Sequence, residues 1–182
     1  MTEHDTKAAL IAIVTVSDRA SRGEYPDTGG PGAEDWLHAT LRPVPEIRRV
    51  IIPDGADSVA GTLKRLADTD GADLILVTGG TGPAPRDRTP EGVAAVIDFD
   101  LPGFGEAMRT ASLAEVPTAI LSRQGAGVRG RTLIITLPGK PSAIATCLNA
   151  VFAAVPYCLD LIGAARIDTN PEVIRAFRPG GG

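Results

Sequence analysis

Short aliphatic runs alternate along the chain with segments whose apolar positions recur at helical spacing. Runs of this length and β-branched content are typical of strands buried on both faces of a parallel sheet. They predict strands over 10–16, 47–52, 73–78, 118–122 and 132–137. Between them, the spacing predicts helices over 32–41, after Asp57, after Thr89 and over 104–113, with Asp57 and Thr89 as their caps. A last long helix opens at 138–142 and is kinked or broken by Pro156.

The link at 123–131 is too short to hold a crossover helix, so strands 118–122 and 132–137 should pair antiparallel if they are neighbours. Alternating strands and helices then predict an α/β fold, a three-layer sandwich with a mostly parallel central sheet and one antiparallel strand. We expect a single domain over 9–178, with flexible ends at 1–8 and 179–182.

The amino-acid composition argues against several classes of function. With 182 residues, 43% of them hydrophobic, the chain can bury one substantial core. A net charge of -4 and 4% aromatic residues argue against a nucleic-acid interface. Cys147 and Cys158 lie in an apolar helical pattern and are expected to be reduced core residues. The polar start and the lack of a long uninterrupted apolar stretch predict a cytoplasmic protein with no membrane segment.

The predicted strand 73–78 runs directly into a glycine-rich loop, TGGTGP at 78–83. Gly79, Gly80 and Gly82 would let backbone N–H groups approach a bound phosphate. The loop has neither the lysine of a Walker A motif nor the third glycine of a dinucleotide fingerprint. It is therefore either an anion-binding loop or a plain strand-to-helix turn.

Four other polar segments follow predicted strands, and ligands bind at the carboxyl ends of strands in such sheets. These segments lie at Ser17 and Asp18, at Asp54, at Ser122 and Arg123, and at Gly139 and Lys140. All five loops can converge on one pocket. Ser17 and Asp18 can contact a ligand or merely cap the next segment. Ser122 is not a hydrolase nucleophile, because no G-x-S-x-G surrounds it, and a ligand-binding hydroxyl fits it better.

Asp54 and Asp87 follow different strands, and the loop from Gly79 to Arg88 is long enough for the two carboxylates to meet. Two acids beside a phosphate loop indicate Mg²⁺, which is usually held by one or two carboxylates and by substrate phosphates. The alternatives are that Asp54 is only a turn residue and that Asp87 is a solvated loop charge or an extra cap for the helix at Pro90.

Eight short motifs are distributed along the chain. They are TVSDRAS at 15–21, IPD at 52–54, TGGTGP at 78–83, RDRTP at 86–90, PGFGE at 102–106, LSR at 121–123, LPGKP at 137–141 and VPYC at 155–158. Together they resemble one family, the molybdopterin adenylyltransferases of molybdenum-cofactor synthesis, whose domain also occurs at the N-terminus of gephyrin. The similarity extends from about residue 9 to 178.

The resemblance implies an enzyme that transfers AMP from ATP, with Mg²⁺, to the terminal phosphate of molybdopterin and releases pyrophosphate. It also implies a homotrimer that transiently contacts the molybdenum-inserting enzyme. The alternatives are molybdate insertion, which in this family belongs to longer chains, and a catalytically silent molybdopterin-binding or scaffolding trimer.

Carried over by motif, the resemblance assigns the catalytic and metal-binding acids to Asp54 and Asp87. It implies that Thr78, Gly79, Gly80, Thr81, Gly82, Pro138, Gly139, Lys140 and Ser142 bind the nucleotide, and that Ser17, Asp18, Ser122 and Arg123 bind the pterin. Lys140 departs from the glutamine or asparagine expected there, and a cation at this position can change the affinity for nucleotide or pyrophosphate. The stretch between Cys147 and Val155 is also shorter than in some members.

Overall fold

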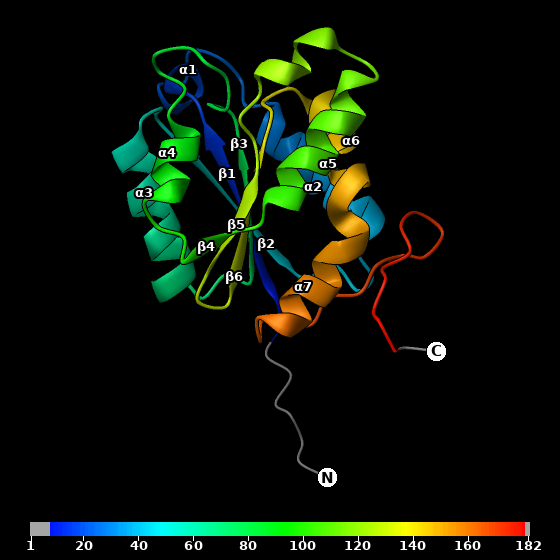
Figure 1. The fold of residues 1–182 in the computed structure, drawn as a ribbon. Coiled ribbons are helices and arrows are strands. Elements are labelled where there is room, and N and C mark those ends of the chain that lie inside the picture. Colours follow the sequence, from blue (N-terminus) through cyan, green and yellow to red (C-terminus); the bar gives the residue numbers. More distant parts are fainter. Residues whose placement is uncertain (1–7, 181–182) are drawn as a thin grey trace.

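The computed structural model describes residues 8–180, so most of the two ends set apart above, 1–8 and 179–182, lies outside the described residues. One six-stranded sheet runs through the molecule in the order β2-β1-β3-β6-β5-β4 (Figure 1). The strands are β1 (Leu10–Val16), β2 (Glu46–Ile52), β3 (Leu74–Thr78), β4 (Phe99–Asp100), β5 (Ala126–Arg129) and β6 (Thr132–Leu137).

Helices cover both faces of the sheet, which makes the fold the expected three-layer α/β sandwich (Figure 1). The helices are α1 (Asp18–Ser21), α2 (Gly29–Thr40), α3 (Ala56–Lys64), α4 (Thr89–Ala94), α5 (Pro102–Leu113), α6 (Pro141–Val151) and α7 (Val155–Leu161). The shorter elements are the π-helical turn η1 (Arg65–Thr69) after α3 and the 3₁₀ segments η2 (Pro117–Leu121) and η3 (Phe152–Ala154).

Strict alternation along the strands divides the core in two. Ile11, Ile13, Leu74 and Leu76 face a cluster with α2, α5, α6 and α7. Their sequence neighbours, such as Ala12 and Ile75, face a second cluster with α3 and α4. Because successive side chains of a strand point to opposite faces, a continuous apolar run is what a strand between two helical layers requires.

Strands β1, β2, β3 and β6 pair in parallel, whereas β5 pairs antiparallel with both β6 and β4. The prediction of one antiparallel strand is therefore confirmed, but its location was wrong. The antiparallel partner of β6 lies inside the presumed link, and most of the predicted strand 118–122 belongs to the 3₁₀ segment η2 instead. Pro117 begins η2, where its fixed φ suits a tight helical turn and its missing N–H costs nothing.

Two predicted helix caps were also wrong. Gly55, with φ of +128°, precedes α3, and Asp57 lies within its first turn. The Thr89 hydroxyl does not cap α4 but donates a hydrogen bond to the Gly79 carbonyl at 2.8 Å. The predicted break at Pro156 is confirmed, since a 3₁₀ turn separates α6 from α7 and Pro156 lies in the first turn of α7.

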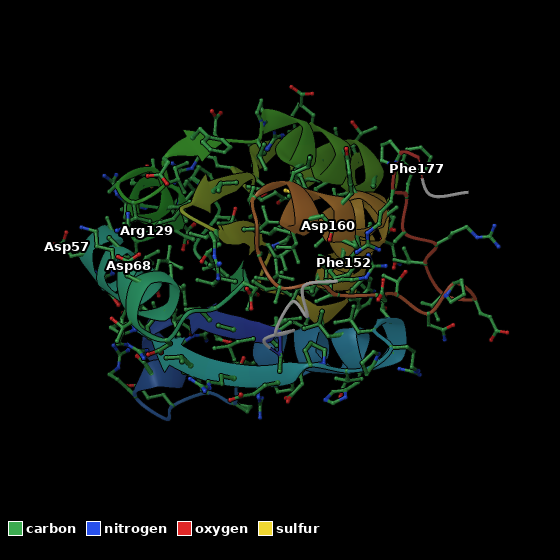
Figure 2. All side chains as sticks on the ribbon, turned by 90° about the horizontal axis from the view of Figure 1, so that it is seen from below. Asp57, Asp68, Arg129, Phe152, Asp160 and Phe177 are labelled. Atoms are coloured by element: carbon green, nitrogen blue, oxygen red, sulfur yellow. The ribbon has the colours of Figure 1, made fainter. Side chains whose placement is uncertain are left out.

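The segment Pro141–Leu161 is long and apolar enough to cross a membrane, since an 18-residue stretch of it has a mean hydropathy of 1.6, but 44% of that stretch is buried inside the protein. Its side chains Ile144, Leu148 and Leu159 are fully buried against the sheet. It is accordingly a core helix pair. Phe152, between the two helices, is also fully buried, whereas Phe177 near the chain end is 70% exposed at the periphery (Figure 2).

At the amino end of the parallel strands, opposite the glycine-rich loop, Arg129 pairs with Asp68 at 2.7 Å (Figure 2). Arg129 also donates to the Val96 carbonyl at 2.8 Å. Near the same edge, the Asp73 carboxylate accepts the backbone N–H groups of Leu10 and Ala165. These contacts tie strand starts to neighbouring loops, so the charged groups of this end have structural partners.

Candidate functional site

Because the four parallel strands point the same way, the loops after β1, β2, β3 and β6 meet at one edge of the sheet. β5 runs in the opposite direction, so the segment just before it, at Ser122 to Gln124, reaches the same edge. The chain reverses its direction of travel across the sheet between β1 and β3, and ligands bind at such switch points in α/β proteins. The five loops therefore meet at one edge of the sheet, but they border two hollows rather than the single pocket predicted, and Asp54 lines neither of the two.

The glycine-rich loop after β3 is shaped by close contacts that side chains would prevent. Gly79 and Gly80 have φ values of +97° and +64°. A Cβ on Gly79 would lie 2.4 Å from the Val16 carbonyl oxygen, and one on Gly80 would lie 2.4 Å from the Thr89 hydroxyl. These glycines are required both by conformation and by space.

Asp54 and Asp87 flank this loop. The position of a Cβ on Gly80 is 3.4 Å from Asp54 Oδ1, and that of a Cβ on Gly82 is 2.7 Å from Asp87 Oδ2. Asp54 Oδ2 accepts the backbone N–H of Asp18 at 2.8 Å, and Asp87 Oδ2 accepts that of Ala84 at 3.2 Å. The other oxygen of each carboxylate has no hydrogen-bond donor among the described residues.

Asp18 and Arg86 join three of the loops. Arg86 donates to both carboxylate oxygens of Asp18 at 2.8 to 3.0 Å and to the Asp54 carbonyl at 3.1 Å. The hydrogen bonds from Arg86 hold the pKa of the Asp18 carboxyl below its usual value. The Asp18 carboxylate, predicted to contact the pterin, thus accepts hydrogen bonds from Arg86 and from the Asp54 N–H.

Arg123, which follows η2, is hydrogen-bonded to the segment that contains Gly82 and Asp87. Its guanidinium donates to the carbonyls of Gly82 and Asp87 and pairs with Glu91 at 2.6 Å. The hydrogen bond from Arg123 lowers the pKa of Glu91. The structure therefore gives Arg123 a loop-bracing position, whereas sequence reasoning placed it among the pterin contacts.

A pocket of about 470 Å³ opens beside the loop. Of the predicted site residues, it is lined by the catalytic candidate Asp87 and by the nucleotide and pterin candidates Gly79, Gly80, Thr81, Gly82, Ser122, Pro138, Gly139 and Lys140. Sequence reasoning missed the rest of the wall, which includes Ser112 of α5, Thr118 of η2, Thr146 of α6, and Glu115 and Gln124 from the segments on either side of η2. No motif marked these residues, because they lie on helices, in connecting segments or in a segment mistaken for a strand, and carry no local signal.

Ser17 and Thr78 line a second hollow of about 210 Å³, between the ends of β1 and β3. Gly79 and Gly139 border both hollows. Ser17 and Ser122, grouped together from the sequence as pterin contacts, therefore face different hollows. Thr78 donates its hydroxyl to the Pro138 carbonyl at 2.8 Å, and Ser142 is exposed without lining either hollow.

Lys140 lies at the mouth of the larger pocket, just before α6. Its side chain is exposed and makes no ion pair or hydrogen bond with any described residue, so its charge is available to a ligand. Within residues 8–180, no group of three or more His, Cys, Asp or Glu side chains is arranged to hold a metal ion. Two carboxylates with one unoccupied oxygen each fit a cation that shares its shell with substrate phosphates.

The chain was compared with known protein families, curated proteins and solved structures. The family model described as "Probable molybdopterin binding domain" matches residues 12–157. The chain is 49% identical to the molybdopterin adenylyltransferase of Haemophilus influenzae over 96% of this chain and 94% of that protein. It is 46% identical to the molybdopterin adenylyltransferase of Escherichia coli, with 93% of each chain covered.

Solved structures agree with this result. The molybdopterin biosynthesis Mog protein of Mycobacterium ulcerans superposes with a TM-score of 0.78 at 37% identity, over 86% of this chain and 98% of that one. The molybdopterin biosynthesis enzyme MoaB of Thermus thermophilus gives 0.76 at 42% identity, over 85% and 96%. The chain belongs to the molybdopterin-binding domain family that includes the molybdopterin adenylyltransferases.

Proposed function

We propose that this protein is a molybdopterin adenylyltransferase of molybdenum-cofactor biosynthesis. The terminal phosphate of molybdopterin attacks the α-phosphorus of ATP, a new P–O–P bond forms, and the bond to the β-phosphate breaks to release pyrophosphate. The observation that carries this proposal is the pair Asp54 and Asp87 on either side of a glycine-rich loop, in a chain 46–49% identical to enzymes of that name.

The loop suits the binding of phosphates. Gly79, Gly80 and Gly82 expose backbone N–H groups without side chains, and Lys140 adds a free positive charge at the pocket mouth. In nucleotidyl transfer, the protein mainly has to position the two substrates and to neutralise the negative charge of their phosphates. The attacking phosphate is already ionised, so no general base is required.

We propose that Asp54 and Asp87 hold Mg²⁺, each through the carboxylate oxygen that lacks a hydrogen-bond donor. When bound, Mg²⁺ would neutralise charge on the phosphates during transfer. The chain's own contribution is to fix the two carboxylates: the Asp18 N–H orients Asp54, and the Ala84 N–H orients Asp87.

The two hollows that share Gly79 and Gly139 support a reaction between two substrates that meet at the glycine loop. We keep the assignment of ATP to 78–82 and 138–140, and leave out Ser142 because it lines neither hollow. Ser122 remains the proposed pterin contact of the larger pocket, and Ser17 becomes a contact of the smaller hollow. Asp18 and Arg123 are reassigned to holding the loops, because their charged groups already have protein partners.

The experiment is to incubate the protein with ATP, Mg²⁺ and molybdopterin in the absence of molybdate and to measure pyrophosphate. Stoichiometric release with formation of adenylated molybdopterin supports the proposal. Binding of molybdopterin without pyrophosphate release would favour the alternative, a silent binding or scaffolding protein. Release that requires molybdate would favour metal insertion.

We further propose that residues 9–178 act as one domain in a cytoplasmic homotrimer that transiently contacts the molybdenum-inserting enzyme. One sheet with its two helical layers supports the single domain. Val116, Ile120 and Leu121 are 49–69% exposed and supply apolar surface for contacts between proteins. Light scattering should give three times the chain mass of 18.8 kDa, and a concentration-independent monomer would contradict the trimer.

A further inference from the structure

Gln124 is a buried polar residue beside the larger pocket, and only 2% of its surface is exposed. It lies between Arg123 and β5, at the edge of the sheet where the loops converge. Its backbone carbonyl accepts a hydrogen bond from Arg109 of α5 at 2.7 Å. A buried amide must satisfy both its donor end and its acceptor end.

Both ends of the Gln124 side chain are occupied. Its Oε1 accepts the hydroxyl proton of Ser122, and its Nε2 donates to Cys147 Sγ of α6 at 3.2 Å. Ser112 Oγ of α5 lies 3.5 Å from the same sulfur. Cys147 is fully buried, and this burial raises the pKa of its thiol, so the sulfur stays neutral. A continuous polar chain thus anchors Gln124 to two helices.

This anchoring determines what Ser122 can offer to a ligand. A serine hydroxyl has one proton and two lone pairs. Its proton goes to Gln124, so the Thr81 hydroxyl, 3.4 Å from Ser122 Oγ, must be the donor of that contact. One lone pair of Ser122 is left for the pocket, and no proton.

We propose that Gln124 is a positioning residue that presents Ser122 to the pocket as a hydrogen-bond acceptor, which selects a ligand carrying an N–H or amino group at that position. The inference rests on the proposed function, since it assigns the larger pocket to molybdopterin. A pterin has ring N–H and amino donors on some edges and a carbonyl oxygen on another. An acceptor at Ser122 therefore selects a donor edge and fixes how the ring system lies relative to the glycine loop.

The test compares Ser122→Ala, Gln124→Met and the double variant with the wild-type protein, by equilibrium binding of molybdopterin and by steady-state kinetics. Methionine keeps the length of glutamine but cannot hold the Ser122 proton as an amide oxygen does. We expect each single variant to weaken molybdopterin binding and raise its KM roughly tenfold, about what one hydrogen bond contributes. The KM for ATP should change by less than about twofold, since the backbone N–H groups of the glycine loop, which are proposed to bind its phosphates, are not altered.

The double variant shows whether Gln124 acts by positioning Ser122 or only by packing in the pocket wall. If Gln124 acts through Ser122, adding Gln124→Met to Ser122→Ala should weaken binding no further. Independent, multiplicative losses would overturn the proposal, as would an equal rise in both KM values. Thermal unfolding of each variant is the folding control.

Cys147→Ala provides a second route if Gln124→Met does not fold. It leaves the Gln124 amide N–H without a partner, and it should raise the molybdopterin KM in the wild-type background but not beside Ser122→Ala. Cys147→Ser, which retains an acceptor for that N–H, should restore binding. Wild-type pyrophosphate release combined with unchanged molybdopterin affinity in every variant would overturn this inference and leave the proposed function standing; absence of release from the wild type would overturn the proposed function instead.

Discussion

Asp18 and Asp54 each donate a backbone N–H to the carboxylate of the other, at 2.8 Å from Asp18 N to Asp54 Oδ2 and 3.1 Å from Asp54 N to Asp18 Oδ1. This reciprocal pair joins the ends of β1 and β2. Arg86 then ties the glycine-loop segment to both residues. One proposed metal ligand is therefore held by three loops at once.

Arg86→Ala should loosen this arrangement and lower turnover roughly tenfold, because Asp54 would lose the support that orients it. The protein should remain folded, since an exposed ion pair contributes only about 0–1 kcal/mol to the free energy of unfolding. Arg48→Ala, which removes an exposed pair with Glu46 on β2, is the matched control and should leave turnover unchanged. Steady-state pyrophosphate release and thermal unfolding check both variants. Equal turnover in Arg86→Ala and Arg48→Ala would refute the role of Arg86.

Gly79→Ala should destabilise the protein by about 1–3 kcal/mol and weaken ATP binding, because the new Cβ meets a backbone carbonyl at a positive φ. Gly61→Ala in α3 is the control. No atom lies within 4 Å of its added Cβ, and alanine in a helix interior is favoured by roughly 0.5–1 kcal/mol. Denaturant unfolding should shift in opposite directions in the two variants. A Gly79→Ala protein with normal stability and ATP affinity would show that the loop is not constrained as described.

Lys140→Gln should raise the KM for ATP by about three- to tenfold, because the free ammonium group at the pocket mouth is replaced by a neutral amide. The salt dependence of ATP binding should become shallower, since one fewer charge is screened. Titrations of ATP over a series of salt concentrations measure both effects. Identical affinity and salt slope for the two proteins would place Lys140 outside the ATP site.

The pair Arg123–Glu91 predicts a pH effect. The hydrogen bond from Arg123 lowers the pKa of Glu91 below its ordinary value of 4.5. Its contribution to stability should be complete above that value and disappear as the pH falls through the lowered pKa. Glu91→Gln should therefore unfold at a lower temperature than the wild type near neutral pH, and the two melting temperatures should converge in acid. A difference that persists unchanged in acid would contradict this assignment.

The four parallel strands β1, β2, β3 and β6 and the loops after them could be predicted from the sequence, because each strand contains a run of aliphatic residues and glycines mark the turn after β3. The short strands β4 and β5 could not. β5 contains Gly127, and it is a strand because it pairs with β6 and β4, which no local pattern encodes. The run at 118–122 looked like a strand, but Pro117 starts a 3₁₀ turn there.

The residues of the candidate site also divide into those with a local sequence signal and those without one. The acids and glycines could be found from motifs, since their chemistry is local. Gln124 could not, because its importance comes from Cys147 and Ser122, which it touches from a buried position. The hydrogen bonds of Arg123 to Glu91 and to the Asp87 carbonyl could not be predicted either. The sequence does not distinguish an arginine that contacts a ligand from one that contacts the protein.

Asp54 and Asp87 should behave as one unit. Asp54→Asn and Asp87→Asn should each reduce turnover, and the double variant should lose much less than the product of the two effects. Pyrophosphate release at saturating ATP and molybdopterin checks the prediction. Independent effects would mean that the two carboxylates do not share a metal ion.

Asp87→Asn tests the central claim most directly, because it keeps the size of the side chain and an oxygen that can accept the Ala84 N–H. With folding verified by circular dichroism and molybdopterin binding retained, pyrophosphate release at saturating substrates and Mg²⁺ should fall by roughly two to four powers of ten, or about 3 to 5 kcal/mol in transition-state stabilisation. A folded Asp87→Asn protein with near-normal turnover would contradict the magnesium role and leave Asp87 as a loop charge beside the start of α4.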